Sequence, residues 1–248
     1  MPVYPTHTMK AFDDELDRLN QTLGRMGGLA ETQLGTAVQA MLTRDEALAA
    51  QVISGDDQVD GAEDHINEQV VRLLALRQPV ADDLRLVMSA LRVASALERI
   101  ADHATSTAHR VAVLNQAPMV PAVKSVARLG WLVRDLLKEA LDAFMSRDAD
   151  RALKVWERDE EVDDLYSSLF RELLTYMMED PRHIAPCTHL QFIAKNLERV
   201  GDHATNLAEA TWFVVHGTPL SANRPKKDMS SYTMAEPRHL SPQDQSPE

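Results

Sequence analysis

One nine-residue motif occurs twice in the chain, one hundred residues apart, and this repeat constrains the fold more than any other feature. The motif reads LERIADHAT at residues 97–105 and LERVGDHAT at residues 197–205, with seven of nine positions identical. Shorter matches lie upstream of each copy: LTRD at 42–45 with MSRD at 145–148, and DQVD at 57–60 with EEVD at 160–163. Self-similarity at a fixed period indicates a tandem duplication. The chain is therefore expected to fold into two similar halves.

Helical periodicity between widely spaced prolines predicts an all-α fold. Aromatic residues make up only 5% of the chain and apolar residues recur at three- and four-residue steps, which favours amphipathic helices over sheets. Helices are expected at about residues 11–42, 44–77, 82–114, 123–145, 147–179 and 186–216. Within the first, a kink or a close packing contact is expected near Gly27. Thr43 has the capping-box spacing to Glu46, and Ser146 is the expected N-cap of the fifth helix.

Short connections between these helices predict two tandem three-helix bundles, at residues 8–117 and 118–216. Residues 217–248 contain five of the twelve prolines and balance four bases with four acids. This tail is expected to be disordered.

Composition excludes several classes of function. The formal net charge of −12 opposes binding to nucleic acid. The single cysteine, Cys187, rules out an intrachain disulfide and suits a cytoplasmic protein, and Cys187 itself is interpreted as a structural residue. No run approaches the ~18 apolar residues of a membrane-spanning helix, so membrane insertion is not expected, although peripheral association remains open.

Acidic pairs four residues apart are the candidate functional residues, because that spacing places both carboxylates on one helix face. In an antiparallel hairpin, facing residues have numbers that sum to twice the turn position. By this count Asp60 faces Asp102, and Asp163 faces Asp202. The candidate metal ligands are Asp56, Asp60, Glu98 and Asp102 in the first half, and Asp159, Asp163, Glu198 and Asp202 in the second.

Carboxylates that converge between helices must be neutralised by protonation, by basic neighbours or by a bound cation. Arg99 and Arg199 each follow a glutamate by one residue and are expected to point about 100° away from it. A cation is then the simplest solution, and all-carboxylate ligation suits Fe, Mn or Mg. His103 and His203 lie too far round their helices and are expected outside the site. The alternative, that the pairs are ordinary solvated acids, stays open.

Because it carries both copies of this motif, the chain resembles the PhoU family over residues 8–216. The resemblance includes QPVADDLR at 78–85 in the first turn and DHATN at 202–206 in the second copy. It implies a duplicated three-helix bundle whose E/D-x-x-x-D motifs, the eight acids above, bind metal clusters. The chain departs from the family pattern at the second turn, DPRH at 180–183, and at Ser106, where the second copy has Asn206.

The resemblance further implies a non-enzymatic negative regulator of the phosphate-starvation response and of phosphate uptake. Such a protein is an adaptor between the ATPase subunit of a phosphate ABC transporter and a sensor histidine kinase. A multinuclear metal carboxylate enzyme is the alternative function, and a purely structural helical bundle is a third interpretation. The long apolar stripes also make a homodimer an expectation.

Overall fold

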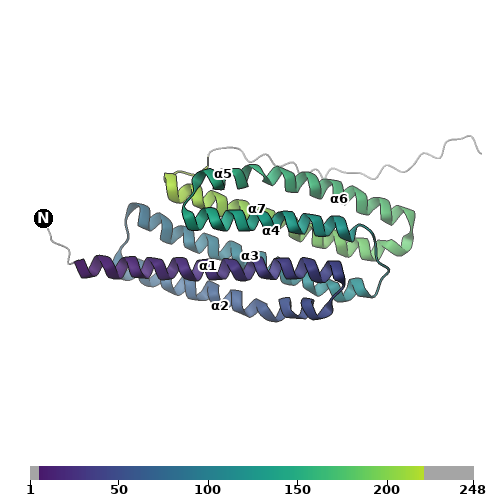
Figure 1. Ribbon diagram of the computed structural model, residues 1–248, viewed down its shortest axis with the longest axis horizontal. Coiled ribbons are helices and arrows are strands. Elements are labelled where there is room, and N and C mark those ends of the chain that lie inside the picture. The colour runs from purple at the N-terminus through teal and green to yellow at the C-terminus, as the bar shows by residue number, and fades with distance from the viewer. Residues whose placement is uncertain (1–5, 221–248) are drawn as a thin grey trace, which may run out of the picture.

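Two layers of long helices make up the described part of the chain, residues 6–220, in a computed structural model (Figure 1). The first layer contains α1 (Thr6–Thr43), α2 (Glu46–Arg77) and α3 (Ala81–Asn115). The second contains α4 (Val123–Ser146), α5 (Ala149–Glu157), α6 (Asp159–Glu179), the 3₁₀ turn η1 (Pro181–His183) and α7 (Ile184–His216). No strand occurs between residues 6 and 220, so the predicted all-α pair of three-helix bundles is confirmed. The disorder predicted for 217–248 concerns residues that, from 221 on, lie outside this range.

The starts of α2 and α5 are set by aspartate caps rather than by the hydroxyl residues that the sequence suggested. The Asp45 carboxylate accepts hydrogen bonds from the backbone N–H groups of Ala47 and Leu48, at 2.9 and 3.0 Å. Asp148 caps α5 in the same way. The predictions for Thr43 and Ser146 were wrong because each residue belongs to the last turn of the preceding helix. Each hydroxyl there donates to a carbonyl four residues earlier.

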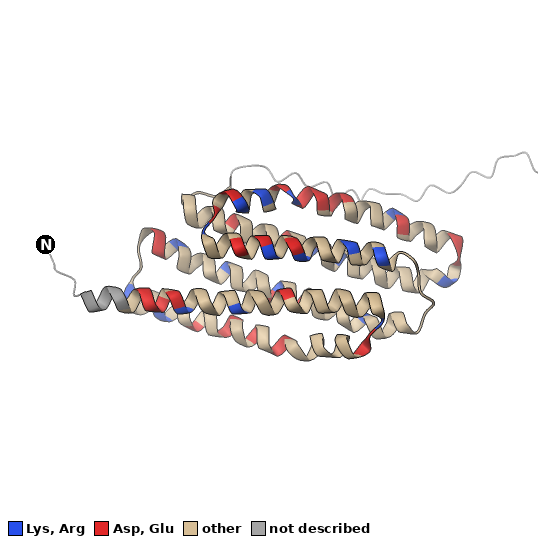
Figure 2. Ribbon diagram, viewed as in Figure 1, with Lys and Arg blue, Asp and Glu red and all other residues tan. Residues whose placement is uncertain are grey.

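The predicted fifth helix is interrupted at Arg158, which separates α5 from α6. Arg158 has φ −77° and ψ −4°, and its carbonyl accepts the Glu161 N–H in a tightened turn. Asp159 therefore opens a new helix whose first turn carries three acids. Acids in a first turn are favoured by the positive end of the helix dipole. Figure 2 shows this group of Asp and Glu residues at the start of α6.

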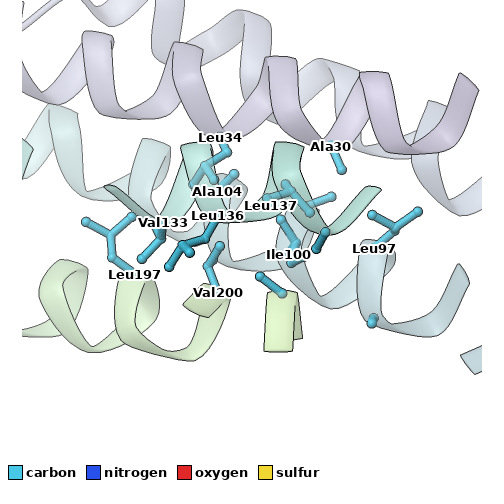
Figure 3. Close-up of a cluster of buried hydrophobic side chains, with 14 of the residues drawn as sticks. Ala30, Leu34, Leu97, Ile100, Ala104, Val133, Leu136, Leu137, Leu197 and Val200 are labelled. Carbon is cyan, nitrogen blue, oxygen red and sulfur yellow. The ribbon is translucent and has the colours of Figure 1, made fainter. Parts of the chain in front are cut away.

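One continuous hydrophobic core joins the two layers, because α1, α3, α4 and α7 pack on one another. Figure 3 shows side chains of all four helices meeting in this core. Close approach of α1 and α4 depends on two glycines, which confirms the packing contact expected near Gly27. A Cβ at Gly27 would lie 2.6 Å from Leu141 Cδ2, and one at Gly130 would lie 2.5 Å from Val38 Cγ2.

No helix between residues 6 and 220 combines the length and the apolar composition needed to cross a membrane.

A bidentate ion pair ties α1 to α2 and gives the fold a pH-dependent contact. Arg77 donates to both Glu15 carboxylate oxygens at 2.9 Å, and this hydrogen bonding lowers the pKa of Glu15. A lowered carboxyl pKa stabilises the fold above the unfolded-state value of about 4.3, and the contribution is lost as pH falls through the folded-state pKa. We expect Glu15→Gln to lower the urea midpoint at pH 7, and we expect this deficit to narrow as the pH falls from 7 to 3. Exposed Glu68→Gln is the control, and an equal deficit of the Glu15 variant at both pH values would contradict the ion-pair explanation.

Candidate metal centres

The first acid cluster, Asp56, Asp60, Glu98 and Asp102, lies between α2 and α3, which pack side by side. The pKa of Glu98 is raised to about 7, first by burial and next by the negative charge of Asp102. Partial loss of solvent also raises the pKa of Asp60, with further contributions from Asp56 and Asp102. Carboxylates from both helices of the hairpin are therefore close enough to disfavour one another's ionisation.

The second acid cluster, Asp159, Asp163, Glu198 and Asp202, lies between α6 and α7 and is more deeply buried. Asp159, Asp163 and Glu198 expose only 5%, 6% and 5% of their surface, whereas Asp202 is half-buried. Removing carboxylates from water to this extent requires compensating positive charge or hydrogen-bond donors.

Basic side chains supply part of that compensation, contrary to the expectation from helical angles. Lys195 Nζ lies 2.9 Å from Glu198 Oε2, one helical turn away, and 5.1 Å from the centre of the Tyr166 ring. In the first cluster, Arg99 approaches Glu98 and Asp102, with nitrogen–oxygen distances of 3.4 Å each. The angular argument failed for Arg99 because a long side chain can fold back along its own helix.

The two clusters consequently differ in their resident positive charge. Position 95, which is equivalent to Lys195 in the repeat, is a serine. The first cluster therefore has only Arg99 as a neighbouring base in its motif, and because the Arg99 side chain is 59% exposed, solvent screens its pairing with Glu98 and Asp102.

Two threonines join the acid clusters, and sequence reasoning did not single them out. The Thr105 hydroxyl donates to Asp56 Oδ1 at 3.1 Å, and the Thr205 hydroxyl donates to Asp159 Oδ1 at the same distance. Both are the last residues of the repeated nine-residue motif, which was the signal available in the sequence. Each hydroxyl orients the first carboxylate of its pair across the hairpin, as an outer-shell hydrogen bond orients a metal ligand.

The donor chemistry of both clusters fits a hard divalent or trivalent cation, since every predicted ligand is a carboxylate. The geometry is not closed: within residues 6–220, no three Asp, Glu, His or Cys side chains are grouped tightly enough to hold one ion. In the first set, Asp60 interacts electrostatically with Asp56 on its own helix and with Asp102 across the hairpin. Ligation would then require side-chain rotations about backbone positions already in register.

His103 and His203 lie at the contact between α3 and α7, with ring centres 5.8 Å apart. Burial lowers the pKa of both imidazoles, that of His103 to about 4, and each ring also faces arginine from the other repeat. The two histidines thus lie at the α3–α7 interface, the seam along which the two repeats contact each other. Cys187 is buried and its thiol pKa is raised by burial, as suits a structural residue.

Comparison with known proteins identifies relatives along nearly the whole chain. A family model described as the PhoU domain matches twice, at residues 23–111 and 126–211. The "Phosphate-specific transport system accessory protein PhoU homolog" of Caulobacter vibrioides is 48% identical over 226 residues, covering 91% of this chain and 98% of that protein.

Two solved structures have the same fold. The crystal structure of PhoU from Pseudomonas aeruginosa matches with a TM-score of 0.81 and 43% identity, over 84% of this chain and 100% of that one. The phosphate transport system regulatory protein PhoU from Streptococcus pneumoniae matches with a TM-score of 0.79 and 29% identity, over 85% and 100% respectively.

Proposed function

The chain belongs to the PhoU family, and we propose that it regulates phosphate transport as a non-enzymatic accessory protein. The observation that carries this proposal is the alignment with a phosphate-specific transport accessory protein over 98% of that relative's length. In this role it acts on the cytoplasmic side as an adaptor between the ATPase subunit of a phosphate ABC transporter and a sensor histidine kinase. It restrains both phosphate uptake and the expression of phosphate-starvation genes.

Exposed apolar side chains at both ends of the molecule support an adaptor role. At the α2–α3 turn, Leu84 and Met88 are 39% and 44% exposed on one stripe of α3. At the α6–α7 turn, Ile184 and Phe192 are 50% and 53% exposed on one stripe of α7. The two turns lie at opposite ends of the long axis (Figure 1). Two separated apolar surfaces suit a protein that contacts two partners.

Metal binding completes the proposal. The carboxylates of each acid cluster would hold the cation, with Thr105 and Thr205 orienting Asp56 and Asp159. The cation would supply positive charge that offsets the repulsion between facing carboxylates and fixes each hairpin. In the second cluster it must first displace Lys195 from Glu198. The first cluster is accordingly the tighter site in this proposal.

Partner binding is tested with purified proteins, using the ATPase subunit of the phosphate transporter and the cytoplasmic part of the sensor kinase from the same cell. We expect the chain to bind both. Leu84→Ser/Met88→Ser and Ile184→Ser/Phe192→Ser should each weaken binding of a different partner by at least tenfold, because each removes one apolar surface. Met119→Ser, at a 53% exposed position in the linker between bundles, is the control.

Two results would count against the adaptor role. One is failure of the folded chain to bind either protein. The other is loss of both partners in the control variant, which would indicate nonspecific apolar adhesion. Deletion of the gene gives an independent measurement, since loss of a negative regulator should leave phosphate-starvation genes expressed at high phosphate.

A further inference from the structure

A groove of about 590 Å³ lies between α3 and α7 on one side of the histidine pair. Its α3 wall presents Arg92 and Arg99. Its α7 wall presents His203, Asn206 and Phe213. The acid clusters lie on the α2 and α6 sides of these helices, and Arg99 links the first cluster to the groove because it also pairs with Glu98 and Asp102.

Hydrogen-bond donors dominate its polar surface. Arg92 is exposed and, among residues 6–220, takes part in no ion pair; its guanidinium lies 5.8 Å from the centre of the Phe213 ring. Arg99 keeps 59% of its side chain exposed, and its two ion-pair distances of 3.4 Å are long. The Asn206 side chain is exposed and offers an amide. Two guanidinium groups and an amide therefore face one open volume.

A single carboxylate, Glu209, lines the same groove. It accepts a hydrogen bond from the indole N–H of Trp156 at 3.3 Å, which directs it toward α5. The chain as a whole carries a net charge of −12, but charges more than about 8 Å away are largely screened at physiological salt. Within that range Glu98 and Asp102 offset much of the charge of Arg99, so the guanidinium group of Arg92 provides the main attraction for an anion in this groove.

The two repeats differ at three positions that line this groove. Positions equivalent to Arg92, Asn206 and Phe213 are Phe192, Ser106 and Val113 in the other repeat. The nine-residue motif is nearly unchanged over the same duplication. The set of Arg92, Asn206 and Phe213 is therefore absent from the equivalent positions of the other repeat, where Arg110 instead stacks on Phe192.

The size and mixed chemistry of the groove define the ligand class. A volume of 590 Å³ is within the range of about 300–1,000 Å³ typical of sites for small organic molecules and far exceeds one phosphate ion. Phe213 adds an apolar surface on which a planar ring can stack, and guanidinium groups suit phosphate oxygens. We propose that the α3/α7 groove binds an organic phosphate of about nucleotide size, with Arg92 and Arg99 on the phosphates and Phe213 against the organic part.

The site goes beyond the adaptor proposal and does not depend on it, because it can be measured without partner proteins. The probes are ADP and inorganic phosphate, titrated by calorimetry into the full chain at constant ionic strength with EDTA present. EDTA keeps cations from bridging phosphate to the acid clusters. We expect saturable ADP binding, at least tenfold tighter than binding of inorganic phosphate.

Variants assign the binding to this groove. Arg92→Ala/Arg99→Ala should weaken ADP binding at least tenfold, and Phe213→Leu should reduce ADP affinity while leaving phosphate affinity unchanged. Arg110→Ala is the matched control, because Arg110 stacks on Phe192 at 4.7 Å on the same helix but outside the groove. Circular dichroism melting checks that each variant is folded.

Three outcomes would overturn the proposal: no saturable ADP binding, an equal loss in Arg110→Ala, or equal affinity for ADP and inorganic phosphate. The last would indicate a free-anion site in place of an organic-phosphate site. Partner binding by a chain that does not bind ADP would leave the adaptor role standing and remove only this inference.

Discussion

Leu137→Ala is expected to lower the free energy of unfolding by about 2–5 kcal/mol, as for other fully buried leucines. Leu137 has 0% exposure and belongs to the core where α1, α3, α4 and α7 meet (Figure 3). Because this core is shared by both repeats, the cavity should destabilise the two bundles together. Urea denaturation followed by circular dichroism and by tryptophan fluorescence should give one coincident transition at a lower midpoint.

Leu76→Ala provides the control for this prediction, since Leu76 is 63% exposed on α2. Its effect should stay within about 0.5 kcal/mol. Two separate transitions, with only one shifted by Leu137→Ala, would mean that the repeats unfold as independent domains and that the shared core adds little cooperativity.

The duplication made much of this architecture predictable. A motif repeated at a spacing of one hundred residues, together with proline positions, was sufficient to place the helices and to bring Asp60 near Asp102 across the first hairpin. The packing of the repeats on each other was not predicted. Periodicity locates an apolar stripe on a helix but does not say which of two neighbouring helices covers it.

The predictions of individual helix ends were wrong where two neighbouring residues could each act as the N-cap. Thr43 and Ser146 are good capping residues by type, yet Asp45 and Asp148 cap the helices instead. The break at Arg158 contains neither proline nor glycine, so composition gave no signal for it. Lys195 precedes Glu198 by three residues, a spacing that places both side chains on one helix face, so this pairing was predictable from the sequence although it was not predicted.

The same duplication explains why the acid clusters are stronger candidates than single acidic pairs. Each threonine–aspartate hydrogen bond recurs at the equivalent position of the other repeat, at 3.1 Å in both. Recurrence of a carboxylate and of the hydroxyl that orients it is more than a solvated helix face requires. The equivalent arrangement in both repeats suggests that the two clusters have the same function, and metal binding is the hypothesis that the next experiment tests.

Asp60→Asn/Glu98→Gln is expected to abolish stabilisation by Mn²⁺ at the first cluster without weakening the metal-free fold. Burial and neighbouring acids raise the pKa of both carboxyl groups, so their charged forms are unfavourable in the folded chain at pH 8. Neutral amides of the same shape remove that cost, and in EDTA the variant should unfold at or above the parent midpoint. Mn²⁺ at 100 times its Kd should add about 2.7 kcal/mol per occupied site to the parent protein.

The control variant, Glu68→Gln/Glu179→Gln, removes two exposed acids outside both clusters and so changes net charge by the same amount. It should retain the full response to Mn²⁺, because neither residue belongs to the cluster. The matching variant of the second cluster, Asp163→Asn/Asp202→Asn, should lose a smaller increment, since Lys195 already pairs with Glu198 there. Thermal melts and metal analysis of dialysed protein measure both increments. Two results would contradict metal binding: no change in the stability of the parent protein on addition of Mn²⁺, or a control variant that loses as much Mn²⁺ stabilisation as the cluster variants. In either case lysine, arginine and threonine side chains alone would stabilise the carboxylates, and the hairpins would need no metal.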